Sequence, residues 1–238
     1  MRAGKAVATD PSKFNPVPKG EEPAGPPRKH VLVFAGHMID TRDRKTPRFP
    51  ADKELVAREK IREVVVDEMN SGACVSAAYA GGASGGDILF HEVCAELGIE
   101  TRLYLAVEPQ DYVTTSVSDA GPNWVERFWK LHVQHAARNQ VHVLSQTAEA
   151  VQDDIDNLPA WLGDKADYNI WQRNNLWMLF NALVEGCDEK TGEPNLTLIA
   201  LWDGEEGDGP GGTGHLVRKV ESLGARVRII NTREVFGL

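Results

Sequence analysis

The chain has 238 residues, and its 35 acidic side chains outnumber its 26 basic ones, which gives a formal charge of −9. This length suits one sizeable domain with its own core, and the acidic balance argues against a nucleic-acid partner. No apolar run approaches the roughly 18 residues that a membrane helix needs, and no apolar signal core is present. The three cysteines are widely spaced, so we expect reduced thiols and no metal site. We therefore expect a cytoplasmic protein that does not contact a membrane.

The first 29 residues differ in composition from the rest of the chain. They hold six of the thirteen prolines and few apolar side chains. Burial therefore cannot offset the entropy of ordering this segment. We expect a disordered, proline-rich leader over 1–29, followed by one domain over 30–238.

From His30 onward, short apolar runs alternate with stretches of helical periodicity. The runs predict strands over 30–35, 75–80, 100–107, 140–144, 196–202 and 226–230. The periodic stretches predict helices over 51–70, 87–97, 124–137, 169–185 and 213–223, with a long polar excursion over 145–167. This alternation predicts a single Rossmann-like, doubly wound α/β fold with a mainly parallel sheet flanked by helices.

Ligands of such sheets bind outside the carboxyl ends of the strands, where backbone N–H groups and helix N-termini favour phosphate. The first predicted strand ends in a loop with four candidate ligand-binding residues, Gly36, His37, Met38 and Asp40. Four basic residues follow within seven positions, and the last of them, Arg48, is also a candidate. Solvated surface charges and contacts with a phosphate or carboxylate explain this basic run equally well.

The second predicted strand ends in a loop with four glycines in six residues. Its candidate residues are Gly81, Gly82, Ser84, Gly85, Gly86 and Asp87. A tight turn needs only one or two glycines, so we expect the backbone to approach a ligand closely here. Asp87 is placed to cap the following helix, and capping alone would account for it. The spacing matches neither a Walker A loop nor G-x-G-x-x-G.

The fifth predicted strand leads into a third glycine-rich loop over 203–214. Its candidates are Gly209, Gly211, Gly212, Thr213 and Gly214, with Thr213 as a helix N-cap or phosphate donor. The acidic residues of this loop, Asp208 among them, favour contact with sugar hydroxyls or a base over a bare phosphate.

Three polar residues, Arg173, Asn174 and Asn175, lie near the start of an otherwise apolar predicted helix. Asparagine lowers helix stability. Two interpretations are open: these side chains hydrogen-bond a ligand, or they hold a neighbouring loop.

These segments together resemble the SLOG superfamily of Rossmann-like domains, which is related to Lonely-Guy-type nucleotide phosphoribohydrolases and DprA-like proteins. The closest similarity is to SLOG-type domains fused to TPR repeats or nucleotide cyclases in bacterial signalling and defence proteins. The resemblance rests on residues 34–40, 47–50, 81–87, 173–177 and 207–213, and it covers nearly all of 30–238. The phosphoribohydrolase motif Pro-Gly-Gly-x-Gly-Thr-x-x-Glu maps onto 210–218, where His215 replaces its threonine and Arg218 its catalytic glutamate.

The resemblance implies a site for a nucleotide or nucleotide-derived signal, with no further cofactor. We expect a sensor whose ligand shifts a conformation or an oligomer, read by a homo-oligomer or by a fused or neighbouring effector. One alternative is a hydrolase of an N-glycosidic bond in a nucleotide or an NAD-like molecule. That chemistry needs a carboxylate, for which the catalytic candidates are Asp40, Asp87 and Asp208. A second alternative is that the domain is retained only for assembly.

Overall fold

The computed structural model describes residues 29–71, 74–145, 160–163, 165, 167–188, 191–205 and 211–238. Within them, six strands form one sheet: β1 (Lys29–Gly36), β2 (Cys74–Ala80), β3 (Thr101–Leu105), β4 (Val141–Val143), β5 (Leu196–Trp202) and β6 (Arg226–Asn231). All neighbouring strands pair in parallel, in the order β4-β3-β2-β1-β5-β6. The predicted Rossmann-like α/β fold is confirmed.

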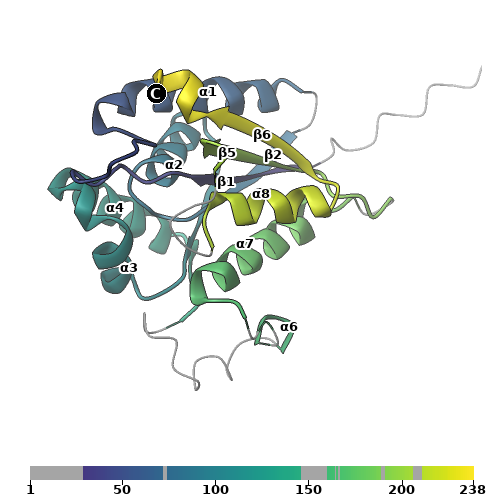
Figure 1. The fold of residues 1–238 in the computed structure, drawn as a ribbon. Coiled ribbons are helices and arrows are strands. Elements are labelled where there is room, and N and C mark those ends of the chain that lie inside the picture. The colour runs from purple at the N-terminus through teal and green to yellow at the C-terminus, as the bar shows by residue number, and fades with distance from the viewer. Residues whose placement is uncertain are drawn as a thin grey trace, which may run out of the picture.

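Helices cover both faces of this sheet (Figure 1). They are α1 (Glu54–Met69), α2 (Gly86–Glu96), α3 (Pro109–Ser116), α4 (Pro122–Ala136), α6 (Ala160–Gly163), α7 (Ile170–Gly186), α8 (Thr213–Ser222) and α9 (Thr232–Phe236). Two 3-10 turns, Ala51–Lys53 and Ser118–Ala120, precede α1 and α4. Among the described helices, none is both long and apolar enough to cross a membrane.

The alternation of side chains along β1 divides the core into two layers. Leu32 and Phe34 pack with α1, α2 and α4, whereas Val31 and Val33 pack with α7 and α8. All four side chains are at most 1% exposed, which is why this strand reads as an uninterrupted apolar run. Burial on both faces holds the carboxyl end of β1 in a fixed place.

The strand order creates a topological switch point at the centre of the sheet. From β1 the chain proceeds through β2 and β3 to β4, and it then returns to place β5 on the other side of β1. The loops that leave β1 and β5 therefore diverge to opposite faces, and a crevice opens between them at the carboxyl edge.

Three features differ from the sequence-based picture. Lys29, assigned to the leader, belongs to β1, whereas 1–28 and most of the polar excursion, 146–159, lie outside the described residues. Helix α3 occupies a segment for which no element was predicted. The short α6 and α9 were not predicted either.

Candidate functional site

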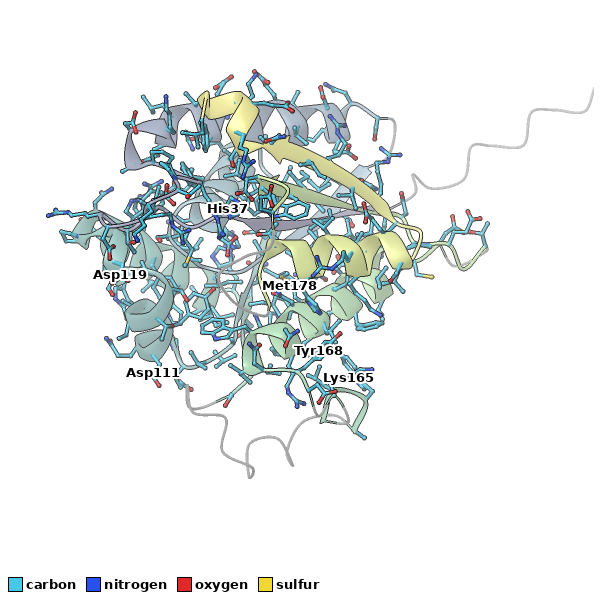
Figure 2. All side chains as sticks on the ribbon, in the orientation of Figure 1. His37, Asp111, Asp119, Lys165, Tyr168 and Met178 are labelled. Atoms are coloured by element: carbon cyan, nitrogen blue, oxygen red, sulfur yellow. The ribbon has the colours of Figure 1, made fainter. Side chains whose placement is uncertain are left out.

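A cleft of about 470 Å³ opens at this switch point. Its walls come from the segments that follow β1, β2 and β5 and from α3 and α7. Figure 2 labels two of its lining residues, His37 just after β1 and Met178 on α7. A space of this size, bounded by several loops at a sheet edge, falls within the range of small-molecule sites.

Gly85 and Gly86 of the second loop hold the floor of the cleft together rather than facing it. Gly85 adopts φ +92°, and a Cβ atom there would meet the backbone nitrogen of Ile39 at 2.9 Å. The Gly86 N–H donates to the carbonyl of His37 at 3.1 Å, and the Ile39 N–H donates to the carbonyl of Ser84 at 3.3 Å. Because these groups bond one another, the first two loops form one docked unit.

Asp87 lies in the wall of the cleft, at the second position of α2. The predicted capping role is wrong, because the N-cap is Gly85 and no side chain caps this helix. The Asp87 carboxyl instead accepts hydrogen bonds from the backbone N–H groups of Ala83 and Gly36, and it therefore bridges the ends of β1 and β2. Burial raises its pKa to about 7, and those two hydrogen bonds offset the burial only in part.

The two asparagines of α7 have different roles. Asn175 Nδ2 donates to the carbonyl of Gly211 at 2.6 Å, so this residue holds the neighbouring loop. Asn174 also lines the cleft and is 4% exposed, yet its Oδ1 has no hydrogen-bond partner. A buried amide oxygen without a partner lowers stability by about 1–3 kcal/mol, so this atom is a candidate for contact with a ligand.

Arg173 is nearly fully buried and does not line the cleft. Its guanidinium donates to the backbone carbonyls of four residues before α7, which are Leu162, Gly163, Lys165 and Tyr168. Leu162 and Gly163 end the short α6, and Lys165 and Tyr168 lie between α6 and α7. Arg173 therefore organises the entry into α7 and is separated from the cleft.

The third loop brings the N-terminus of α8 to the cleft. Gly211, Gly212 and Thr213 line it. The N-cap is Gly212 and no side chain caps the helix, so the predicted N-cap role of Thr213 is wrong. The first N–H groups of a helix have no partner within it, and α8 begins at Thr213, in the wall of the cleft. Asp208 and Gly209 lie outside the described residues.

Asp40 lines the cleft, but its carboxylate is engaged within its own loop. Oδ2 accepts the N–H groups of Arg48 and Phe49, each at 2.9 Å, and Arg44 Nε lies 3.1 Å from Oδ1. The Asp40 N–H donates to the carbonyl of Phe49, which closes the loop over 40–49. Asp40 thus shapes the basic loop, and Arg44 and Arg48 from that loop lie at the mouth of the cleft.

His37 pairs with Asp203 at the end of β5. His37 Nε2 lies 3.1 Å from Asp203 Oδ1 and 3.1 Å from the backbone nitrogen of Asp203. Burial lowers the pKa of His37, and Asp203 opposes this only in part. Burial would raise the pKa of Asp203, but the Glu205 N–H, His37 and Arg48 together lower it. The pair therefore stays as neutral imidazole and carboxylate near pH 7.

One wall of the cleft, which carries aromatic and hydroxyl groups, was not predicted from the sequence. Tyr112, Thr115 and Ser116 reach the cleft from α3, and Trp171 faces Tyr112 with ring centroids 5.6 Å apart. The Gly82 N–H donates to the Tyr112 hydroxyl at 3.1 Å, which leaves the phenolic hydrogen available as a donor. Pro109 at the first position of α3 is the signal that could have revealed this helix.

Most of the predicted site residues meet at the cleft. Those that line it are Gly36, His37, Met38, Asp40, Arg48, Gly81, Asp87, Asn174, Asn175, Gly211, Gly212 and Thr213. The predicted residues that lie behind this surface are Gly82, Ser84, Gly85, Gly86, Arg173 and Gly214. Within the described ranges, no group of three or more histidine, cysteine or acidic side chains could hold a metal ion.

No protein-family model matches the chain, and no curated protein matches it.

Proposed function

We propose that the cleft binds a nucleotide or nucleotide-derived signal, and that the domain acts as a sensor. The observation that carries this proposal is the unpaired, buried Oδ1 of Asn174 in the wall of a switch-point cleft. The N-terminus of α8 opens into the same space. The Asn174 oxygen suits a donor on the amide edge of a base or on a sugar hydroxyl, and the N-terminus of α8 suits an anion.

The remaining walls fit the parts of such a ligand. Trp171, which is partly exposed in the cleft wall and packs against the buried Tyr112, offers an aromatic ring on which a base can stack. Arg44 and Arg48 at the mouth attract an anion to an otherwise acidic protein. Because the pKa of Asp87 is about 7, its carboxyl is close to half protonated at neutral pH and repels an anionic ligand less than an ordinary aspartate would.

A sensing role follows from how the walls are joined. The ligand would contact loops from both sides of the switch point, and Asn175 already ties the Gly211 carbonyl to α7. Occupation of the cleft favours one arrangement of these loops, and a homo-oligomer, a fused domain or a neighbouring effector reads that shift. The resemblance to SLOG domains supports this role, since some members of that superfamily recognise ligands without turnover.

Calorimetry against nucleoside monophosphates, NAD and cyclic dinucleotides tests the proposal, with Asn174→Leu as the diagnostic variant. Leucine removes an amide that has an unpaired oxygen, so the ligand-free variant should unfold at the same or a higher temperature than the wild type. Its affinity for the ligand should fall about tenfold or more.

Asn181→Leu is the matched control on the same helix, because Asn181 is exposed and donates only to the Trp177 carbonyl. It should bind as the wild type does. The proposal fails if no compound of the panel binds, or if Asn174→Leu and Asn181→Leu bind equally well.

Asp87 supports one alternative, an N-glycosidic hydrolase. A carboxyl with a pKa of about 7 in a cleft wall can donate or accept a proton at neutral pH. Asp40, the other predicted carboxylate that lines the cleft, is engaged by two N–H groups and by Arg44.

Chromatography of NAD and nucleoside monophosphates after incubation should then reveal a released base. Asp87→Asn keeps an oxygen that can accept the Ala83 N–H but cannot exchange the proton, so it should abolish the release while the fold persists. Binding without any base release would instead assign the cleft to sensing.

A further inference from the structure

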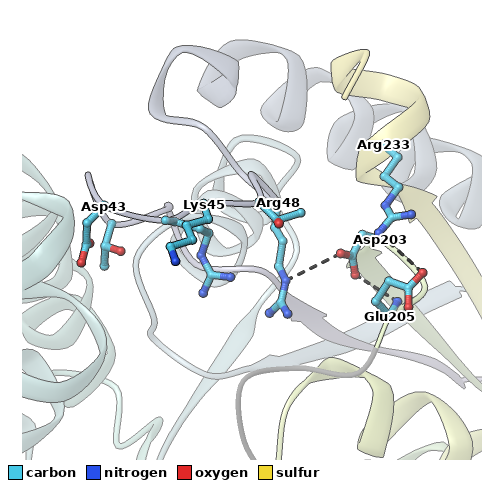
Figure 3. A pocket seen from close by; sticks show the side chains of 9 residues that line it. Asp43, Lys45, Arg48, Asp203, Glu205 and Arg233 are labelled. Carbon is cyan, nitrogen blue, oxygen red and sulfur yellow. Dashed lines mark hydrogen bonds and ion pairs between the residues drawn. The ribbon is translucent and has the colours of Figure 1, made fainter.

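A second open space adjoins the cleft. It measures about 590 Å³ and shares Thr41, Arg44 and Arg48 with the first space. The loop over 41–48 forms one side, and Asp203, Glu205 and Arg233 form the other (Figure 3). The two spaces therefore meet along the basic loop, with Arg44 and Arg48 at their boundary.

Four cationic side chains border this second space, contributed by two separate elements. Arg44, Lys45 and Arg48 come from the loop after β1, and Arg233 comes from α9. Lys45 is exposed and has no ion pair among the described residues. A cation whose charge is unmatched, facing a concave surface in a protein of charge −9, is suited to an anion.

Three acidic side chains, Asp43, Asp203 and Glu205, also line the space, so its cationic side chains outnumber them by one. Asp203 Oδ1 is contacted by His37 and by the Glu205 N–H, each at 3.1 Å, and Oδ2 lies 3.6 Å from Arg48 Nε. Glu205 pairs with Arg233 at 3.5 Å, and both side chains are about half exposed. Such a surface pair stabilises by at most about 1 kcal/mol, so an incoming phosphate can displace Glu205 from Arg233.

We propose that the second space is a subsite for a further phosphate, so that the ligand of the cleft carries two or more phosphate groups. This inference rests on the proposed function, because it extends the ligand from the cleft. The first phosphate lies at the α8 N-terminus. The next passes Arg44 and Arg48 into the space bordered by Lys45 and Arg233. The ligand class is a nucleoside diphosphate or a longer polyphosphate.

Calorimetry with each nucleoside monophosphate and its diphosphate, and with inorganic pyrophosphate, tests the subsite. The wild type should bind the diphosphate about tenfold more tightly than the monophosphate. Lys45→Ala should weaken diphosphate and pyrophosphate binding about fivefold and leave monophosphate binding unchanged, since Lys45 lines only the second space. Lys130→Ala, which removes one exposed positive charge from α4, is the matched control and should change none of these affinities.

The outcomes separate the subsite from the proposed function. Equal affinity for mono- and diphosphates, with no effect of Lys45→Ala, overturns the subsite and leaves the nucleotide cleft standing. Pyrophosphate binding that depends on Lys45, without binding of any nucleotide, supports the subsite and overturns the nucleotide assignment. Binding of neither probe overturns both.

Discussion

Gly85 shows how a single residue determines the geometry of the cleft floor. Its backbone, at φ +92° and ψ −120°, lies in a region that side chains rarely adopt. A Cβ atom there would also lie 2.9 Å from the nitrogen of Ile39 and 3.0 Å from the carbonyl oxygen of His37. Both neighbours are backbone atoms that take part in the contact between the first two loops, so neither can move without separating those loops.

Gly85→Ala should therefore lower the free energy of unfolding by roughly 2–3 kcal/mol, measured by urea denaturation. Gly98→Ala is the matched control, because Gly98 also has a positive φ, +74°, but a Cβ atom there meets nothing within 4 Å. It should lower stability by only about 1 kcal/mol, the cost of the backbone strain alone. Equal losses in the two variants would contradict the steric role assigned to Gly85.

The roles of individual residues were the part of the site least accessible to sequence. The glycine count of the second loop predicted that something approaches the backbone closely. We expected that close neighbour to be a ligand. In the structure, the loop after β1 is what lies against Gly85 and Gly86. The sequence allowed both roles for the asparagine pair, and the structure gives the loop-holding role to Asn175 and leaves Asn174 Oδ1 unpaired. Whether an asparagine holds a loop or is free to contact a ligand depends on which hydrogen bonds its amide already forms within the protein.

At the scale of elements, the sequence predicted the strands well. The central strands β1 and β5 are buried along most of their length, so their apolar runs alone mark them, whereas the edge strands β4 and β6 are only partly buried. Helix α3 was missed because its sequence, Pro-Gln-Asp-Tyr-Val-Thr-Thr-Ser, is rich in residues with low helix propensity. Its buried Tyr112 and Val113 side chains stabilise it through tertiary packing, which a local pattern does not report. The same helix supplies the aromatic side of the cleft, so an error in one element concealed a wall of the site.

At the scale of the whole molecule, parallel topology predicted the edge at which the site lies but not which loops meet there. Any doubly wound sheet gathers its β–α loops at the carboxyl edge. Only the strand order, with β5 beside β1, brings Thr213 into the same cleft as Gly36. The crossover that determines this order spans residues between β4 and β5 whose sequence carries no signal of strand position.

The acid response is also a property of the whole molecule, because six of the seven histidines have a lowered pKa. Burial is the main cause in each case, and for His91 it lowers the pKa to about 3. Each of these side chains therefore takes up its proton at a lower pH in the folded state than in the unfolded chain, where the pKa is about 6.5. The unfolded state then binds more protons, so stability falls as the pH drops below 6.5.

Asp87 has the opposite effect on stability, which rises as the pH falls between about 7 and 3.8. Its folded pKa of about 7 exceeds the ordinary value of 3.8, so between these values the folded state binds the extra proton. His91, with a folded pKa of about 3, offsets most of this contribution, and the other five histidines act in the same direction as His91, so urea denaturation from pH 7.5 to 5.0 should show a falling free energy of unfolding. Asp87→Asn removes the opposing contribution, so its profile should fall more steeply than that of the wild type. A stability that is constant or rises on acidification would contradict the neutral burial of the histidines.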